Sequence, residues 1–198
     1  MILPSYRLRC IIMSYLCIVL QHKTESKMEL IASFQVDHTD LKPGIYISRQ
    51  DNVGGEKVTT YDIRMTSPNH EPAMAPSAIH TLEHIVATYL RNDSEWKERV
   101  IYWGPMGCLT GNYLILKGEY PCTEIRDLMI RAFEHAASYT DQVPGTTAAT
   151  CGNYLLHDLP MARWEAARYV KRLREEFVSE YPGIERPLDA GGNIFHDA

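Results

Sequence analysis

Three side chains that commonly bind or serve a metal ion lie within one five-residue stretch, at His80, Glu83 and His84. The surrounding residues 77–90 contain no Gly or Pro, and their apolar positions recur at helical spacing, so we expect a helix with Ser77 as its N-cap. Histidines four residues apart lie on the same face of a helix, where both imidazoles can reach one divalent ion. Glu83 lies beside them, as a further ligand or as an unligated proton carrier.

The order H-x-x-E-H is the signature of the inverzincin metallopeptidases, so hydrolysis is one interpretation, and a chance pair of surface histidines is the other. A catalytic metal site needs about three protein ligands. The third could be Glu83, another histidine or one of three cysteines. Cys151 precedes a glycine in a polar loop that a metal can approach, Cys108 lies in a glycine-rich turn that suits a reactive thiol, and Cys122 is better explained as a packing residue.

The elements that must position these residues alternate in short pieces. We expect turns at residues 51–55 and 104–108, a loop at 68–76, strands at 31–36, 44–48, 57–65, 99–103 and 112–118, and further helices at 123–139 and about 161–180. One face of the second helix is apolar, through Ile125, Leu128, Met129, Ala132, Phe133 and Ala136. This order predicts the α+β class, with helices packed on an antiparallel sheet.

The length of 198 residues favours one domain, and 45% apolar residues are enough for a core. A net charge of −5 gives no electrostatic reason to expect nucleic acid or an anionic membrane as a partner. The five cysteines are odd in number and scattered, which is typical of a reducing compartment such as the cytoplasm.

The two ends of the chain differ from the rest. Residues 1–27 place basic residues before a short apolar run without a small-residue cleavage site, so we interpret them as an extension outside the domain, from a mis-assigned start or a signal-like segment. Met28 begins an ordinary domain sequence, and we expect the catalytic domain to span residues 28–181. Residues 182–198 are rich in Gly, Pro and Asp, and we expect a loose tail.

Four motifs together resemble the LuxS family of S-ribosylhomocysteine lyases. They are S-F-Q-V-D-H-T at residues 33–39, I-H-T-L-E-H at 79–84, P-M-G-C-L-T-G at 105–111 and C-G-N at 151–153, in the order and at the spacing of the family. The resemblance covers about residue 28 to the last helix. It implies a single LuxS/inverzincin-like domain, a homodimer with active sites at the interface, and one Fe(II) per subunit that zinc or cobalt can replace.

The resemblance also implies roles for individual residues. The metal ligands would be His80, His84 and Cys151, with water as the fourth. General acid/base catalysis would fall to Cys108 and Glu83. Contacts to the substrate, partly across the dimer interface, would come from Ser33, His38 and Arg64, the last within a Y-D-I-R-M stretch that matches the family.

The implied reaction converts S-ribosylhomocysteine to homocysteine and 4,5-dihydroxy-2,3-pentanedione, the precursor of autoinducer-2. Movement of the carbonyl group along the carbon atoms of the sugar passes through enediolates, which a Lewis-acidic metal can stabilise. A β-elimination then expels homocysteine. Two proton carriers are needed because protons leave one carbon and arrive at the next. The alternatives are an H-x-x-E-H zinc peptidase, which would leave Cys108 and Cys151 idle, and an inactive metal-binding homologue.

Some positions depart from the family pattern. Leu109 stands where Gln or Arg is usual, and residues 102–104 (Y-W-G) stand where Asp-Ile-Ser is common, which brings recognition of the amino-acid end of the substrate into question. The other histidines, His70, His135 and His157, are better explained as surface or packing residues, although His157 follows Cys151 closely enough to support the metal site.

Overall fold

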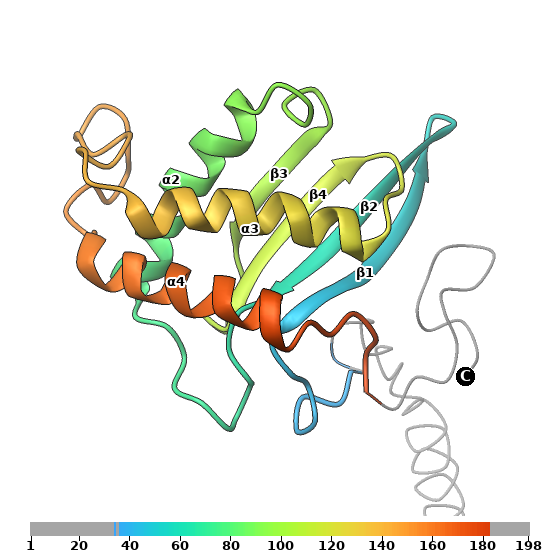
Figure 1. The fold of residues 1–198 in the computed structure, drawn as a ribbon. Coiled ribbons are helices and arrows are strands. Elements are labelled where there is room, and N and C mark those ends of the chain that lie inside the picture. The colour runs from blue at the N-terminus through green and yellow to red at the C-terminus, as the bar shows by residue number, and fades with distance from the viewer. Residues whose placement is uncertain (1–33, 35, 183–198) are drawn as a thin grey trace, which may run out of the picture. The chain divides into compact units, whose positions relative to one another are not determined.

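The computed structural model describes residue 34 and residues 36–182 of this chain. In this part of the chain four strands form one antiparallel sheet in the order β1-β2-β4-β3 (Figure 1). The strands are β1 (Gly44–Val53), β2 (Glu56–Arg64), β3 (Val100–Pro105) and β4 (Gly111–Lys117). Three helices pack on this sheet: α2 (Pro76–Asn92), α3 (Cys122–Ser138) and α4 (Leu159–Glu175). The α+β prediction is therefore confirmed.

The first two strands form a hairpin that is tighter than predicted. Gly54 and Gly55 have φ angles of +61° and +87°, a conformation that costs glycine little and is typical of two-residue hairpin turns. Residues 51–53, which we expected in the turn, instead continue β1, and Val53 pairs with Glu56. The turn expected at 104–108 likewise begins later, because Gly104 and Pro105 belong to β3.

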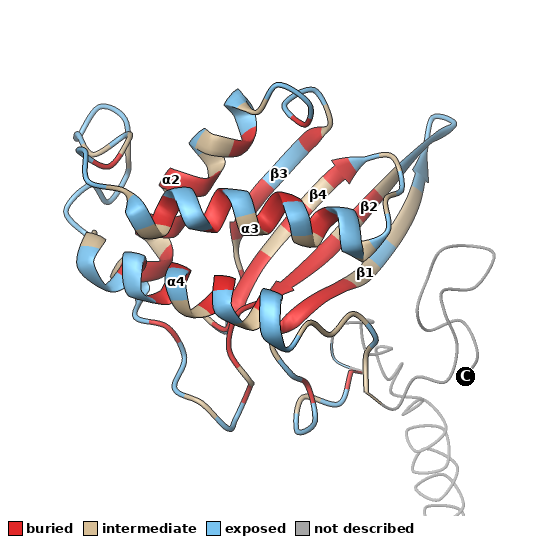
Figure 2. Ribbon diagram, viewed as in Figure 1, coloured by how far each residue is buried: buried red, intermediate tan, exposed pale blue. Residues whose placement is uncertain are grey.

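Alternation along the strands separates two faces of the sheet. One face packs against the helices: Ile63 on β2 and Leu114 on β4 join Leu82 and Phe133 in the main apolar core (Figure 2). All six apolar residues predicted on the inner face of α3 are buried. The other face of β2 carries Asp62 and Arg64, so the same strand supplies both the core and a polar site.

The helix of the H-x-x-E-H motif begins earlier than predicted. Pro76 occupies its first turn, and Ala75 is the N-cap without a side-chain hydrogen bond, so the assignment of Ser77 as N-cap was wrong. The carbonyl of Ser77 instead accepts a hydrogen bond from the Thr81 hydroxyl at 2.7 Å. Proline suits this position because its missing N–H would have no intrahelical partner.

Several predictions fall at the ends of the chain. The extension of residues 1–27, Ser33 and the tail from residue 183 onwards lie outside the described residues. Of the strand expected at 31–36, the described residues Phe34 and Val36 are not in a strand. Among the described helices, none is long and apolar enough to cross a membrane.

Candidate functional site

Four potential metal donors meet between α2 and the loop that precedes α4. The donor atoms of His80, His84, Cys151 and His157 all lie within 4.8 Å of one another. The Cys151 Sγ lies 3.5 Å from Nε2 of His80, a separation close to that of two ligands on one tetrahedral ion. Helical spacing places the two α2 histidines on one face, and the loop supplies the other two donors.

Backbone carbonyls orient both histidines of α2. The Nδ1 atom of His80 donates to the carbonyl of Leu156 at 2.8 Å, and the Nδ1 atom of His84 donates to the carbonyl of Pro144 at 2.7 Å. Each ring therefore leaves Nε2 for the cluster, the arrangement found around metal-ligating histidines.

His157 also belongs to this cluster. The Thr81 hydroxyl donates to Ser77 and so accepts from Nδ1 of His157, at 3.2 Å. Its Nε2 then holds a lone pair that is buried and has no hydrogen-bond partner in the described part of the chain. Burial, with His80 and His84 nearby, lowers the pKa of His157, so protonation of its ring is disfavoured. Its place in the cluster agrees with the expectation that His157 follows Cys151 closely enough to support the metal site.

The donor set fits a divalent transition metal. Two imidazoles with free Nε2 atoms and one thiol form a His2Cys set that suits iron, zinc or cobalt and leaves room for a non-protein ligand. The ring of His157 stacks on that of His80, with centroids 4.3 Å apart and planes 19° apart. Stacked rings cannot both direct in-plane lone pairs at one ion, so Nε2 of His157 is better suited to accept a hydrogen bond from a ligand of that ion.

Glu83 lies beside this cluster without joining it. Its side chain is half-buried on α2, and no ion pair holds it among the described residues. Because the cluster contains no carboxylate, the ligand set of the peptidase alternative, which requires a distal glutamate, is absent from the described residues. Glu83 is free to carry a proton.

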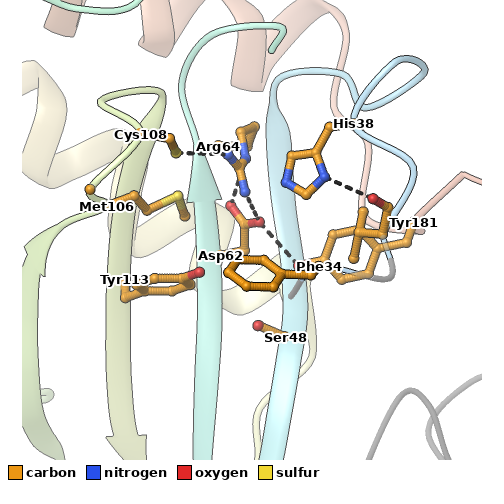
Figure 3. A pocket seen from close by; sticks show the side chains of 11 residues that line it. Phe34, His38, Ser48, Asp62, Arg64, Met106, Cys108, Tyr113 and Tyr181 are labelled. Carbon is orange, nitrogen blue, oxygen red and sulfur yellow. Dashed lines mark hydrogen bonds and ion pairs between the residues drawn. The ribbon is translucent and has the colours of Figure 1, made fainter. Parts of the chain in front are cut away.

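A second polar site lies on the face of the sheet away from the helices. It is a cavity of about 280 Å³ whose polar lining includes His38, Ser48, Asp62, Arg64 and Cys108. Figure 3 shows Arg64 between Asp62 and Cys108, with His38 on the opposite side. None of the four metal donors lines this cavity. The residues we expected to serve one reaction therefore occupy two separate regions of one chain.

The thiol of Cys108 is exposed at the cavity mouth and lies beside a hydroxyl and a cation. Its Sγ is 3.0 Å from Oγ1 of Thr110 and 3.8 Å from Nη1 of Arg64. Partial burial opposes ionisation, but the hydrogen bonds of Thr110 and the positive charge of Arg64 outweigh it and lower the pKa of Cys108. The position suits a thiol that ionises more readily than an ordinary cysteine.

The turn that presents this thiol includes the first departure from the family pattern. Leu109 has a φ of +58°, in the left-handed region that costs a branched residue energy. Its amide donates to Met106, its carbonyl accepts from Met74, and its side chain packs against the apolar core. Leu109 does not line the cavity, so this substitution leaves the polar lining intact.

The second departure also lies outside the cavity. Trp103 is buried against Phe133 in the core, and Tyr102 is exposed on β3. Neither Tyr102 nor Trp103 lines the cavity within this chain.

The remaining candidates behave as expected. His70 and His135 are exposed, which confirms their interpretation as surface residues. Cys122 is half-buried at the start of α3, and burial raises its pKa to about 11, so it is an unreactive packing residue.

Comparison with known proteins places nearly all of the described region in one group. Residues 31–180 match the family model described as S-ribosylhomocysteinase (LuxS). The S-ribosylhomocysteine lyase of Phocaeicola vulgatus is 53% identical over 161 residues, which cover 80% of this chain and 100% of that protein. The proteins of the same name from Porphyromonas gingivalis W83 and Desulfotalea psychrophila are 50% and 51% identical, each over 77% of this chain and 96% of their own length.

Proposed function

This chain belongs to the LuxS family of S-ribosylhomocysteinases, and we propose that it cleaves S-ribosylhomocysteine to homocysteine and 4,5-dihydroxy-2,3-pentanedione. Relatives that it resembles over nearly their whole length bear the name of this lyase. The reaction would return homocysteine to the activated methyl cycle for methionine metabolism and supply the autoinducer-2 precursor for quorum sensing. The observation that carries the proposal is the His2Cys cluster, which suits carbonyl chemistry on a sugar.

His80, His84 and Cys151 would hold one Fe(II) per subunit, with zinc or cobalt as possible substitutes. Such an ion would supply Lewis acidity, which stabilises negative charge on the sugar oxygens as the carbonyl moves from one sugar carbon to the next. The carbonyls of Leu156 and Pro144 contribute by fixing the orientation of the two imidazoles.

Cys108 and Glu83 would move the protons. A Cys108 thiolate beside Arg64 can remove a proton from one sugar carbon and return it to the neighbouring carbon. The half-buried carboxylate of Glu83 can transfer protons in the same way from a different side of the bound sugar. The last proton removal generates the enolate that expels the homocysteine sulfur by β-elimination. Two carriers are consistent with a reaction that shifts a carbonyl twice.

Arg64 and His38 would bind the substrate in the cavity beside Cys108, and Ser33 would join them. The Arg64 guanidinium and the His38 ring present donors suited to sugar hydroxyls. A cavity of about 280 Å³ holds only part of a molecule as long as S-ribosylhomocysteine. The remainder of the substrate has to extend beyond it.

A homodimer with active sites at the interface would complete the site. Within one chain the metal cluster and the cavity share no residue, so a second subunit is the natural source of the missing half. Large apolar side chains flank both regions and are exposed: Phe34 at the cavity is 68% exposed, and Leu155 in the loop of the cluster is 79% exposed. Apolar surface of this kind is typical of association sites.

We further propose that residues 28–181 form the catalytic unit and that the protein works in the cytoplasm. Cys108, Cys122 and Cys151 are free thiols, and a reducing compartment would keep Cys108 and Cys151 available for chemistry.

Release of thiol from S-ribosylhomocysteine by metal-loaded protein tests the function. We expect stoichiometric homocysteine, and about a 1,000-fold slower release from the Cys108→Ala variant, because it lacks one proton carrier. Cys122→Ala is the matched control, since it removes a thiol of the packing type and should leave release unchanged. An inactive wild-type protein with a full metal complement, or undiminished release by Cys108→Ala, would contradict the proposal.

A further inference from the structure

A buried ion pair forms the floor of the cavity. The Asp62 carboxylate accepts hydrogen bonds from Nε of Arg64 at 3.1 Å and from its Nη2 at 2.5 Å, and the two side chains are 3% and 4% exposed. In the strand register Asp62 lies between Tyr46 on β1 and Tyr113 on β4. A charged pair at this depth needs further polar partners to remain ionised in a fixed geometry.

One of those partners comes from the segment that follows α4. The Tyr181 hydroxyl donates to Oδ2 of Asp62 at 3.0 Å. Its ring stacks on that of Tyr46, with centroids 4.5 Å apart and planes 15° apart. The same segment is attached to the edge of the sheet, because the carbonyl of Val178 accepts from the amide of Ile45 at 3.0 Å. Tyr181 is therefore held on two sides and also lines the cavity.

Arg64 connects this partner to the reactive thiol. Its Nη1 donates to Oγ1 of Thr110 at 2.5 Å and lies 3.8 Å from Sγ of Cys108. A chain of polar contacts thus runs from the Tyr181 hydroxyl through Asp62 and Arg64 to Cys108. Hydrogen-bonded groups in a low-dielectric environment polarise one another, so the loss of the Tyr181 hydroxyl should change the environment of the Cys108 thiol.

We propose that Tyr181 is a positioning residue, which fixes the Asp62–Arg64 pair and thereby sets the reactivity of Cys108. Its hydroxyl takes up part of the negative charge of Asp62, so Arg64 keeps more of its positive charge available to the thiolate. Without that hydroxyl the carboxylate draws the guanidinium more strongly and the thiolate is less favoured. The inference builds on the proposed role of Cys108, but thiol reactivity can be measured without turnover.

The test compares two variants that each remove one hydroxyl from the same stacked pair. Tyr181→Phe loses the hydrogen bond to Asp62, whereas Tyr46→Phe loses a hydrogen bond to the Lys42 carbonyl, which does not lead to Arg64. Alkylation of Cys108 by iodoacetamide is followed between pH 5 and 10 by mass spectrometry of the peptide that contains Cys108. The titratable groups facing this thiol are Arg64 with Asp62, Tyr113 and Tyr181 behind it, and His38 across the cavity.

For Tyr181→Phe we expect the alkylation midpoint to move up by about half a pH unit, which is about a threefold slower rate below the midpoint. Tyr46→Phe should match the wild type, and thermal unfolding of the two variants should be similar. Equal midpoints in all three proteins, or equal shifts in both variants, would overturn the inference. A failure of the lyase proposal would look different: Cys108 would show the expected alkylation pattern while S-ribosylhomocysteine released no thiol.

Discussion

The metal cluster takes its donors from a helix and a loop, and backbone carbonyls hold two of its imidazoles. The cavity instead takes its polar groups from the outer face of the sheet and from the loops beside it. In the cluster, His80 and His84 are oriented through main-chain contacts. In the cavity, Arg64 is oriented through the side chains of Asp62 and Thr110. The first region is built to present free lone pairs, and the second to hold a cation beside a thiol.

This difference indicates how each region should respond to substitution. Donors fixed by the backbone keep their geometry when a neighbouring side chain changes. The affinity of the cluster for a metal ion should therefore fall only when a donor, or a group in contact with a donor, is replaced. Side chains in one hydrogen-bonded network are energetically coupled, so the cavity should respond to a change at any member. The two regions should respond independently of each other within one subunit.

Loss of a metal donor should produce the largest difference between the two regions, with metal affinity strongly reduced and the reactivity of Cys108 unchanged. We expect Cys151→Ala to bind Zn²⁺ more than about 100-fold more weakly, because a thiolate ligand is removed from a three-donor site. Competition with a chromophoric chelator measures this affinity. The alkylation profile of Cys108 should be unchanged in the same protein, and a shifted profile would show that the regions are not independent.

Replacement of His157 should have an intermediate effect confined to the cluster. Its buried Nε2 can accept a hydrogen bond from a ligand of the ion, and groups in this position usually contribute about a tenfold factor in metal affinity. His157→Phe keeps a ring that can stack on His80 and removes the nitrogens, while His157→Ala removes both. About a tenfold loss in each variant is expected; wild-type affinity in His157→Phe would mean that only stacking matters.

The pH dependence of Cys108 should show the smallest effect, confined to the cavity. Because its pKa is lowered, the thiolate should form with a midpoint below the ordinary value of about 8.5, and the alkylation rate should rise with pH and level off above that midpoint. Thr110→Val removes the hydroxyl that contacts both the thiol and Arg64. It should raise the midpoint and slow alkylation at pH 7 by about threefold, with zinc affinity unchanged.

Local patterns were enough to predict most of the fold. The helix that carries His80 and His84, the apolar face of α3 and the α+β class follow from periodicity, since burial on one face imposes that spacing. The predicted ends of the helices and strands were less accurate. The turn at Gly54–Gly55 and the start of α2 at Pro76 depend on backbone geometry, which the spacing of apolar residues does not indicate.

Contacts between distant segments were beyond the reach of local patterns. Cys151 contacts His80 across 71 residues, and Tyr181 contacts Asp62 across 119 residues. The pattern left several candidates for the third metal donor, and the resemblance to the family selected Cys151. Alternation along β2 could have placed Asp62 and Arg64 on one face, but their partners depend on strand register and on the course of the chain after α4. The position of His157 close to Cys151 was visible in the sequence, but nothing local indicated its contact with Thr81.

The most direct test of the two-region account mixes two inactive variants. Cys151→Ala lacks a metal donor and Cys108→Ala lacks the thiol. In a mixed dimer, one site combines the intact cluster of the Cys108→Ala subunit with the intact cavity of the Cys151→Ala subunit, and the other site lacks both. After subunit exchange, randomly mixed dimers should recover about a quarter of wild-type thiol release, since half of the dimers carry one intact site of two. Mixtures that stay as inactive as either variant, with subunit exchange verified by native mass spectrometry, would contradict an active site shared between subunits.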